Sequence, residues 1–353
     1  MSDSSAASGA ATGAPGTAPR KRVLSGMRPT GAMHLGHWHG ALKNWVRLQD
    51  EYECFFFAAD WHALTTHYEE REVIETSVYE MVTDWLAAGL DPDKATLFIQ
   101  SRLPEHAELF TLLAMGTPLG WLERMPTYKD QIERLKDKDL ATYGFLGYPL
   151  LQAADILIYR AAFVPVGVDQ APHVEITREV ARRFNHLYGR RHGEAQTVLP
   201  EPATLLTETS RLPGLDGAKM SKSVGNDIAM REEPAEIERK VRRMQTDPDR
   251  VRRTDAGNPE RCPVWQFHRV YSDADTQDWV RKGCTSAGIG CLECKQPVID
   301  AIVAEQRPWR ERAEAYLSNP KQVQWIVEVG TEQARGVARR TMRDVRAAMG
   351  LVY

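Results

Sequence analysis

From residue 22 onward the chain alternates short apolar runs with longer segments in which apolar residues recur about every 3.6 positions. The apolar runs have the length of β-strands and cover 22–27, 53–59, 95–100 and 163–167. The helical segments between them cover 34–50, 73–88 and 147–159. Strands separated by segments of helix length predict an α/β fold with a parallel sheet.

The strand pattern ends near residue 225, and only helical patterns follow, at 234–244, 263–271, 296–316, 323–329 and 332–349. We therefore expect an α/β domain at 21–225, a helical domain at 226–330 and a C-terminal helix at 331–353 that packs back on the first domain. Residues 1–20 are rich in Ser, Ala, Gly, Thr and Pro, a composition that predicts a disordered tail. Its basic residues follow this tract instead of preceding an apolar stretch, so the tail does not resemble a signal peptide and we expect a cytoplasmic protein.

Composition removes several classes of protein. A chain of 353 residues is long enough for two domains, and it has no run of about 18 apolar residues that would predict a membrane helix. Its net charge of −3 excludes a generic polycation, so we expect contact with RNA only through local basic faces and none with DNA. Five cysteines in a chain of this length do not make a disulfide-stapled scaffold.

The first strand leads into a turn, Pro29-Thr30-Gly31, and then into His34-Leu35-Gly36-His37 at the start of a helix. The chain has neither a Walker P-loop nor a GxGxxG turn. A helix N-terminus offers free N–H groups to phosphate, and two imidazoles three positions apart share one face. Gly36 would let a nucleotide approach the backbone. The four residues alone would equally fit two ordinary surface histidines.

A second motif, Lys219-Met220-Ser221-Lys222-Ser223, lies between glycines further along the chain. Two lysines and two serines can hold a triphosphate and stabilise the charge on departing pyrophosphate. A solvated basic loop is the alternative for two lysines, but the combination with the upstream histidine motif favours a nucleotide site.

With these two motifs the chain resembles a class I aminoacyl-tRNA synthetase, and the intervening segments resemble the bacterial tryptophanyl type. Those segments are SGMRPTG (25–31), ADWHALT (59–65), YPLLQAADIL (148–157), VPVGVDQ (164–170) and HVEITREVARRFN (173–185). The resemblance implies a Rossmann-like parallel sheet with an all-α C-terminal domain. It also implies that the protein activates L-tryptophan with ATP and Mg²⁺, transfers it to tRNA(Trp) and works as a homodimer.

The resemblance also implies roles for individual residues. Catalytic roles fall to His34, His37, Lys219 and Lys222. ATP binding falls to Arg28, Pro29, Thr30, Gly36, His37, Gly167, Val168, Asp169, Leu212, Lys219, Met220, Ser221, Lys222 and Ser223, with Asp169 on the ribose. Tryptophan binding falls to Gly26, His62, Tyr148, Gln152, Asp155 and Gln170, while Val164 and Val166 line the pocket.

Asp155 is the one carboxylate in an apolar helical run, so it needs a partner or faces a cavity. By itself it could be a structural partner of a neighbour such as Arg160; by resemblance it accepts the indole N–H. Two residues depart from the best-known bacterial members, Arg28 for Gln and Gln152 for Met. Gln152 with Asp155 also resembles the tyrosine-specific sister family, which remains an alternative. Two others are an HxGH nucleotidyltransferase and an inactive tryptophan-binding paralogue.

Four of the five cysteines, Cys262, Cys284, Cys291 and Cys294, follow the spacing C-x21-C-x6-C-x2-C. Four thiolates suit a zinc ion or an iron–sulfur cluster. The segment resembles that of the bacterial tryptophanyl enzymes that bind a [4Fe–4S] cluster, although the first spacer is one residue shorter. The expected group is therefore a [4Fe–4S] cluster, with zinc as the second choice.

Two basic groups are candidates for contact with tRNA phosphates. The first contains Arg239, Lys240, Arg242, Arg243, Arg250, Arg252 and Arg253, and the second contains Arg335, Arg339 and Arg343 on the last helix. In both cases an ordinary solvated helix face is the alternative.

Overall fold

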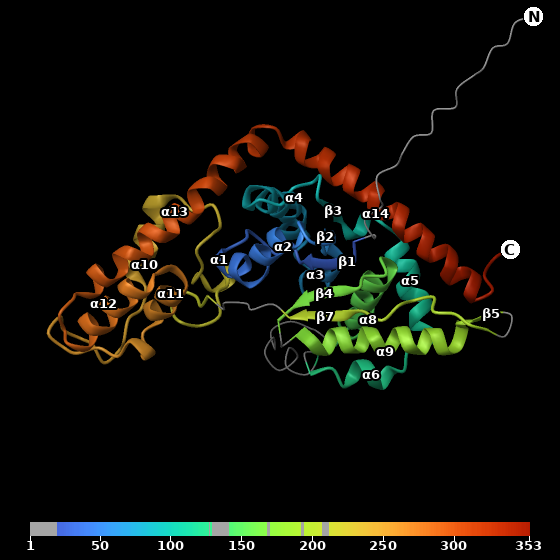
Figure 1. Ribbon diagram of the computed structural model, residues 1–353, viewed down its shortest axis with the longest axis horizontal. Coiled ribbons are helices and arrows are strands. Elements are labelled where there is room, and N and C mark those ends of the chain that lie inside the picture. The colour runs from blue at the N-terminus through green and yellow to red at the C-terminus, as the bar shows by residue number, and fades with distance from the viewer. Residues whose placement is uncertain (1–19, 127, 129–140, 168–169, 192–193, 207–211) are drawn as a thin grey trace, which may run out of the picture.

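The computed structural model describes residues 20–126, 128, 141–167, 170–191, 194–206 and 212–353. Its centre is a five-stranded parallel sheet with the strand order β3-β2-β1-β4-β7 (Figure 1). The strands are β1 (Arg22–Met27), β2 (Glu53–Ala58), β3 (Ala95–Ile99), β4 (Phe163–Val166) and β7 (Ala203–Leu206). The four predicted strands are confirmed. The pattern did not reveal β7, a four-residue edge strand whose side chains are mostly exposed.

Alternate side chains of the central strands point into two separate cores. Val23 and Phe56 belong to one core, and Leu24 and Phe55 belong to the other. The first core is covered by the helix after β1 and by α4 (Arg71–Ala88) and α13 (Cys291–Ser318), and the second by α5 (Glu105–Ala114), α8 (Tyr143–Ile158) and α9 (Ala171–Tyr188). Helices on both faces explain why the strands are continuously apolar.

The helix predicted at 34–50 consists of α1 (Leu35–His37), a π-helical turn at Trp38–Leu42 and α2 (Lys43–Leu48). Short π-helical turns inside α-helices are frequent at functional sites. The remaining elements are α3 (Asp60–His67), α6 (Leu119–Glu123), β5 (Arg190–Arg191), β6 (Glu194–Ala195), α10 (Pro234–Arg243), α11 (Pro263–Tyr271) and α12 (Ala274–Thr285), with 3-10 turns at Gln100–Arg102, Lys222–Val224 and Pro259–Arg261. No helix in the part of the chain described here is both long and apolar enough to span a bilayer.

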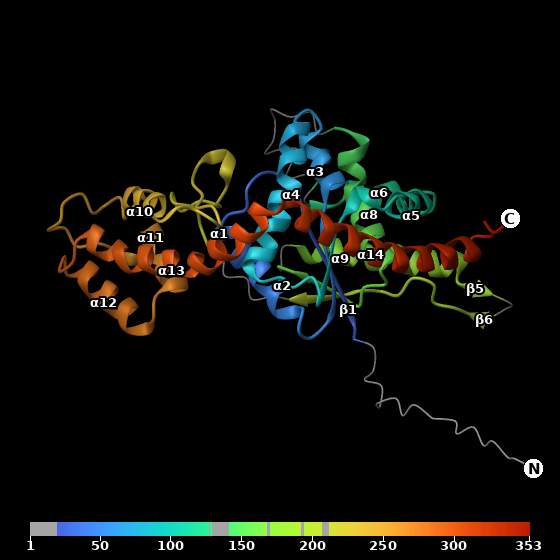
Figure 2. The same ribbon diagram turned by 90° about the horizontal axis from the view of Figure 1, so that it is seen from above.

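The helices α10, α11 and α12 form a lobe at one end of the molecule, and α13 leads from this lobe back to α4 (Figures 1 and 2). The last helix, α14 (Pro320–Ala348), then crosses the open edge of β3 and continues along α5. The sequence predicted two helices here, 323–329 and 332–349, because Gly330 interrupts the pattern. The structure has a single helix, in which Gly330 lies against the backbone of Leu97.

Three arginines of α14 bind to α5 and to the turn before it. Arg339 pairs with Glu105, Arg346 pairs with Glu108, and Arg335 donates to the carbonyl of Arg102. The predicted packing of the last helix on the first domain is confirmed. Its basic row is largely engaged with α5 and the turn before it.

Candidate active site

A cavity of about 450 Å³ opens at the carboxyl ends of β1 and β4, the place where parallel α/β sheets bind ligands. Among the residues singled out from the sequence, it is lined by Gly26, Arg28, His62, Tyr148, Gln152, Asp155, Val164, Val166, Gly167, Gln170 and Lys219. Several other lining residues were not predicted from the sequence, among them Gly40, Asn44, Thr65, Phe145 and His173. Asn44 lies on α2 and His173 on α9, and only the packing of these helices shows that both side chains line the cavity. Val168 and Asp169 lie outside the described residues.

The histidine motif forms the corner between β1 and α1. The rings of His34 and His37 stack with their centroids 3.8 Å apart, and Nδ1 of His37 accepts the backbone N–H of His34. A side chain at Gly36 would meet the His34 ring at 2.9 Å, so only glycine fits there. Burial, followed by the neighbouring His34 and Lys219, lowers the pKa of His37 to about 3. Its imidazole is therefore neutral at neutral pH.

The lysine motif lies against this corner. The buried sulfur of Met220 accepts the backbone N–H of Gly36 at 3.3 Å, and the N–H of Leu35 donates to the carbonyl of Ile228. Lys222 lies over Gly31, whose φ of +117° and whose lack of a Cβ leave room for the lysine side chain. The two motifs, nearly two hundred residues apart, are thus one structural unit.

Asn226 holds the lysine loop in shape. Its side chain accepts the N–H of Ser221 at 2.7 Å and donates to the carbonyl of Lys219 and to the carboxylate of Asp216. Leu212 is buried in the same core as Met220. The pattern of the motif gives no indication of Asn226, which follows it by three residues.

Asp155 lies at the bottom of the cavity and is 1% exposed. Its carboxylate accepts hydrogen bonds from His62 Nε2 at 2.7 Å, from His106 Nδ1 at 2.7 Å and from Gln100 Nε2 at 2.8 and 3.0 Å. Burial would raise the pKa of Asp155, but the hydrogen bonds from His106 and His62 outweigh it, and the net shift is downward. Arg160, the alternative partner, pairs with Asp344 instead. An ionised acceptor therefore faces the cavity.

A cation and an aromatic ring occupy the cavity wall. Burial lowers the pKa of Arg28, and the neighbouring Tyr148 acts in the opposite direction. The hydroxyl of Tyr148 lies 3.4 Å from Nε2 of His173, whose pKa is lowered to about 4 by burial and by His62. Arg28 and Lys219 line the same cavity, so it combines positive charge with the carboxylate at its bottom.

The four clustered cysteines all lie in the helical lobe. Cys262 precedes α11, Cys284 lies near the end of α12, and Cys291 and Cys294 lie in the first turn of α13. Burial and then the nearby Cys262, Cys284 and Cys291 raise the pKa of Cys294 to about 12. Within the described ranges, no three or more His, Cys, Asp or Glu side chains are spaced to hold one metal ion.

Basic groups surround these cysteines. The buried guanidinium of Arg250 lies 3.8 Å from Sγ of Cys284 and donates to the carbonyl of Ile289 at 2.6 Å. Nε2 of His268 lies 3.4 Å from Sγ of Cys294. Lys295 is buried beside the same group.

Most of the basic group before Cys262 is already engaged. Arg239, Lys240 and Arg242 pair with Glu236, Glu232 and Glu238. Arg253 pairs with Glu293, whereas Arg243 and Arg252 are exposed.

Comparison with known proteins agrees with this geometry. The family model described as "tRNA synthetases class I (W and Y)" matches residues 18–305. The tryptophan–tRNA ligase of Ralstonia nicotianae is 62% identical, with 94% of this chain and 99% of that protein covered. The corresponding ligase of Thermotoga maritima is 49% identical over 94% of this chain and 100% of its own length.

Solved structures give the same result. The tryptophanyl-tRNA synthetase of Campylobacter jejuni, complexed with ADP and tryptophan, is 30% identical with a TM-score of 0.81, over 93% of this chain and 99% of that chain. A tyrosyl-tRNA synthetase from Archaeoglobus fulgidus, covering 84% of this chain and 91% of its own, is 24% identical with a TM-score of 0.62 and shares the fold alone.

Proposed function

Since the chain belongs to the class I tRNA synthetases of the tryptophan and tyrosine type, we propose that it is a tryptophan–tRNA ligase. It activates L-tryptophan with ATP to give tryptophanyl-adenylate and pyrophosphate, and then transfers the amino acid to tRNA(Trp). The observation that carries this proposal is the ionised carboxylate of Asp155 at the bottom of the cavity. An indole N–H is a donor only, so a carboxylate is its natural acceptor.

In the first step the tryptophan carboxylate attacks the α-phosphorus of ATP in line with the departing pyrophosphate. Catalysis of such a reaction is mainly positioning and charge stabilisation. His34, Gly36 and His37 hold the triphosphate and ribose side, together with Pro29, Thr30, Leu212, Met220, Ser221 and Ser223. Because His37 is neutral, it offers one ring N–H as a donor. We assign the ribose contact to Asp169, in the segment Gly167-Val168-Asp169.

Lys219 and Lys222 stabilise the charge on departing pyrophosphate. ATP enters as its magnesium complex, in which phosphate oxygens hold the metal and part of the charge is already neutralised. Arg28 places a further fixed cation in the same cavity as Lys219. We assign this cation to the α-phosphate or to the substrate carboxylate.

Tryptophan lies with its indole toward Asp155 and its amino acid end toward Gln170. Gly26, His62, Tyr148, Gln152, Val164 and Val166 form the walls. A side chain at Gly26 would meet the ring of Phe57 at 2.6 Å, so this wall requires glycine.

The test is ATP–pyrophosphate exchange with each of the twenty amino acids. We expect exchange with tryptophan and not with tyrosine. The variant Asp155→Ala should lose tryptophan-dependent exchange while retaining ATP affinity. A buried hydrogen bond to a charged group contributes about 1.5–3 kcal/mol, so the loss should be tenfold or more. Exchange with tyrosine alone would show that the protein is a tyrosine–tRNA ligase. Exchange with no amino acid would refute the proposal that it is a synthetase.

The four cysteines hold a structural [4Fe–4S] cluster in this proposal. A single tetrahedral zinc ion would need sulfur atoms about 3.8 Å apart, given zinc–sulfur bonds of about 2.3 Å. We prefer the cluster to zinc because the cysteine segment resembles that of the cluster-binding bacterial enzymes. Arg250 beside Cys284 and Lys295 nearby suit its negative charge. The cluster would brace the lobe and supply no open coordination site.

Protein purified without oxygen should be brown and contain iron and acid-labile sulfide in equal amounts. The variant Cys291→Ser should lose both, whereas Cys54→Ser, in the sheet core, should retain them. Stoichiometric zinc without iron would contradict the cluster.

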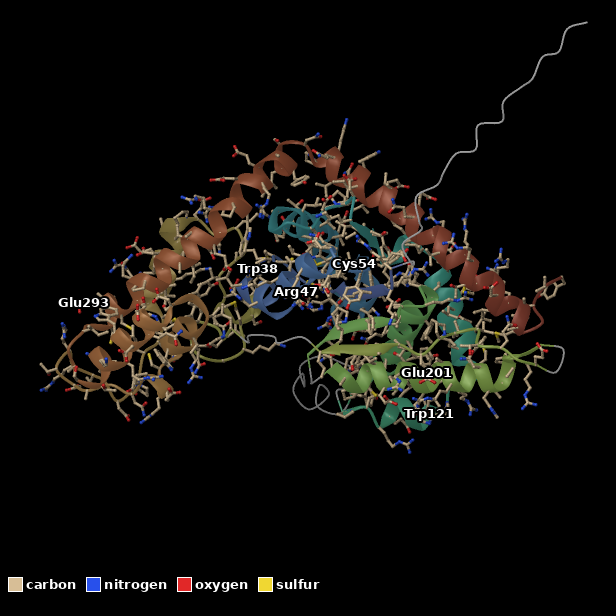
Figure 3. All side chains as sticks on the ribbon, viewed as in Figure 1. Trp38, Arg47, Cys54, Trp121, Glu201 and Glu293 are labelled. Carbon is tan, nitrogen blue, oxygen red and sulfur yellow. The ribbon has the colours of Figure 1, made fainter. Side chains whose placement is uncertain are left out.

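We place a homodimer interface on α6 and the adjacent ends of α5 and α9. Met115 and Leu119 are 74% and 57% exposed, and Leu187 is 47% exposed beside them. Figure 3 shows Trp121 on α6, where the guanidinium of Arg183 lies 6.0 Å from its ring. Light scattering should give twice the chain mass, and Leu119→Glu should give a monomer. A monomeric parent would refute the dimer. None of the five cysteines forms a disulfide bond, which suits the proposed cytoplasmic location.

The proposed division of the chain has the catalytic domain at 21–225, the tRNA-side domain at 226–330 and the terminal helix at 331–353. The exposed Arg243 and Arg252 are the members of the first basic group that we propose for tRNA phosphates. Residues 1–19 lie outside the described part.

A further inference from the structure

Behind the cavity, Gln100 and His106 donate hydrogen bonds to Asp155, and the hydroxyl of Tyr159 bonds to His106. We infer that Gln100, His106 and Tyr159 are positioning residues that keep one acceptor site of Asp155 turned toward an indole N–H. They thereby set the preference for an amino acid that carries such a donor. This inference rests on the proposed function and concerns residues that do not line the cavity.

The first observation is the number of donors on the carboxylate. An ionised carboxylate has about four acceptor sites. His62, His106 and Gln100 supply three N–H groups, with Gln100 shared between the two oxygens. Each oxygen therefore has two contacts, and a substrate N–H would take over one of the two sites between which the single Gln100 donor is shared. Removal of any one donor would let the carboxylate rotate or take up water.

The second observation fixes the direction of each hydrogen bond. Both ring nitrogens of His106 are engaged, Nδ1 with Asp155 and Nε2 with the hydroxyl of Tyr159 at 2.7 Å. The carboxylate accepts only, so Nδ1 carries the proton and the Tyr159 hydroxyl donates to Nε2. Burial, Asp155 and Glu105 raise the pKa of Tyr159 well above its usual range, so the hydroxyl keeps its proton. Tyr159 thus selects the His106 tautomer that donates.

The third observation is a buried oxygen of Gln100, Oε1, that has no hydrogen-bond partner among the described residues. Turning the amide over would satisfy neither group, because Oε1 would then face the carboxylate. An unpaired buried oxygen is destabilising, and its presence here is consistent with the requirement for an N–H at Asp155.

The surroundings leave these side chains little freedom. Gln100 and His106 are both 0% exposed. The ring of Phe98 lies 6.2 Å from that of His106 and 5.4 Å from that of Tyr159, so it packs on both without a hydrogen bond. Phe98 does not line the cavity and therefore offers a matched control for packing.

The experiment compares kcat/KM in ATP–pyrophosphate exchange for tryptophan and for β-(3-benzothienyl)-L-alanine, in which sulfur replaces the indole N–H. The parent protein should prefer tryptophan. In His106→Leu the ratio of the two kcat/KM values should fall roughly tenfold or more, because tryptophan alone loses its acceptor. Tyr159→Phe should lower the ratio in the same direction by less. Phe98→Leu should lower stability but keep the ratio.

A ratio that stays at the parental value in both His106→Leu and Tyr159→Phe would overturn the inference. So would an equal fall in Phe98→Leu, since that would indicate loosened packing only. If His106→Leu does not fold, Gln100→Met serves in its place, because it removes another N–H donor from Asp155 and should lower the ratio in the same direction. A parent that exchanges with tryptophan and the analogue equally overturns this inference alone, whereas a parent without tryptophan exchange overturns the proposed function.

Discussion

Lys222 illustrates how a single residue can be placed for the transition state. Its side chain lies over Gly31, outside the group of residues that line the amino acid cavity. In the proposed mechanism the lysine therefore acts on departing phosphate without touching bound tryptophan. Its position distinguishes Lys222 from Asp155 and Gln170, which line the cavity itself.

We predict that Lys222→Ala lowers the rate of adenylate formation far more than it weakens tryptophan binding. Loss of an interaction made mainly in the transition state lowers kcat and leaves substrate affinity nearly unchanged. Single-turnover kinetics give the rate, and fluorescence titration gives the affinity. Lys282→Ala, an exposed lysine of α12 that pairs with Asp278, is the control and should match the parent. A change confined to tryptophan affinity would contradict the assigned role.

At the scale of elements, α14 joins the edge of the sheet by a backbone contact that only glycine permits. A Cβ at Gly330 would lie 2.0 Å from the carbonyl oxygen of Leu97, and backbone cannot move aside as a side chain can. Gly336, six residues later in the same helix, has only the flexible end of Arg340 within reach, at 3.8 Å.

Gly330→Ala should therefore push α14 away from β3 and lower the free energy of unfolding, by about 1–3 kcal/mol as in other overpacked sites. Gly336→Ala should be neutral or stabilising by up to about 1 kcal/mol, because alanine favours the helix. Urea unfolding of both variants measures this difference. Equal stability of the two variants would show that α14 does not need the close contact.

The same elements show what a sequence can and cannot predict. The strands β1 to β4 were predictable because each contains a short apolar run between turns. The single helix α14 was not, because Gly330 breaks a pattern that only the neighbouring β3 explains. The two motifs identified the nucleotide corner, but His106 and Gln100 lie about fifty residues from Asp155 and no local spacing links them to it.

On the scale of the whole molecule, the two halves are joined by a partly buried polar group. Glu305 of α13 accepts hydrogen bonds from Trp38 Nε1 and from the hydroxyl of Tyr271, each at 2.9 Å, and lies 3.5 Å from His39. Burial would raise the pKa of Glu305, but the hydrogen bonds from His39, Trp38 and Tyr271 hold it lower. The helix that begins with the histidine motif is thereby tied to the lobe that carries the cysteines.

Global stability should also depend on pH through His173. Its pKa is lowered to about 4, mainly by burial and then by His62. In the unfolded chain it takes up a proton near its ordinary value of 6.5, whereas the folded protein does so only near 4. The stabilisation is thus complete above about pH 6.5 and is lost as the pH falls toward the folded value, amounting to roughly 2 kcal/mol by about pH 4.5.

Urea unfolding near pH 7 and near pH 4.5 tests this expectation. The loss of stability between the two pH values should be smaller in His173→Gln than in the parent, by roughly 2 kcal/mol, because glutamine does not titrate. His186→Gln replaces an exposed histidine of the same helix α9 and should show the parental loss. Comparing each variant with itself at two pH values cancels any loss of packing that the substitution causes. An unchanged pH dependence in His173→Gln would mean that the imidazole accepts its proton in the folded protein as readily as in the unfolded chain.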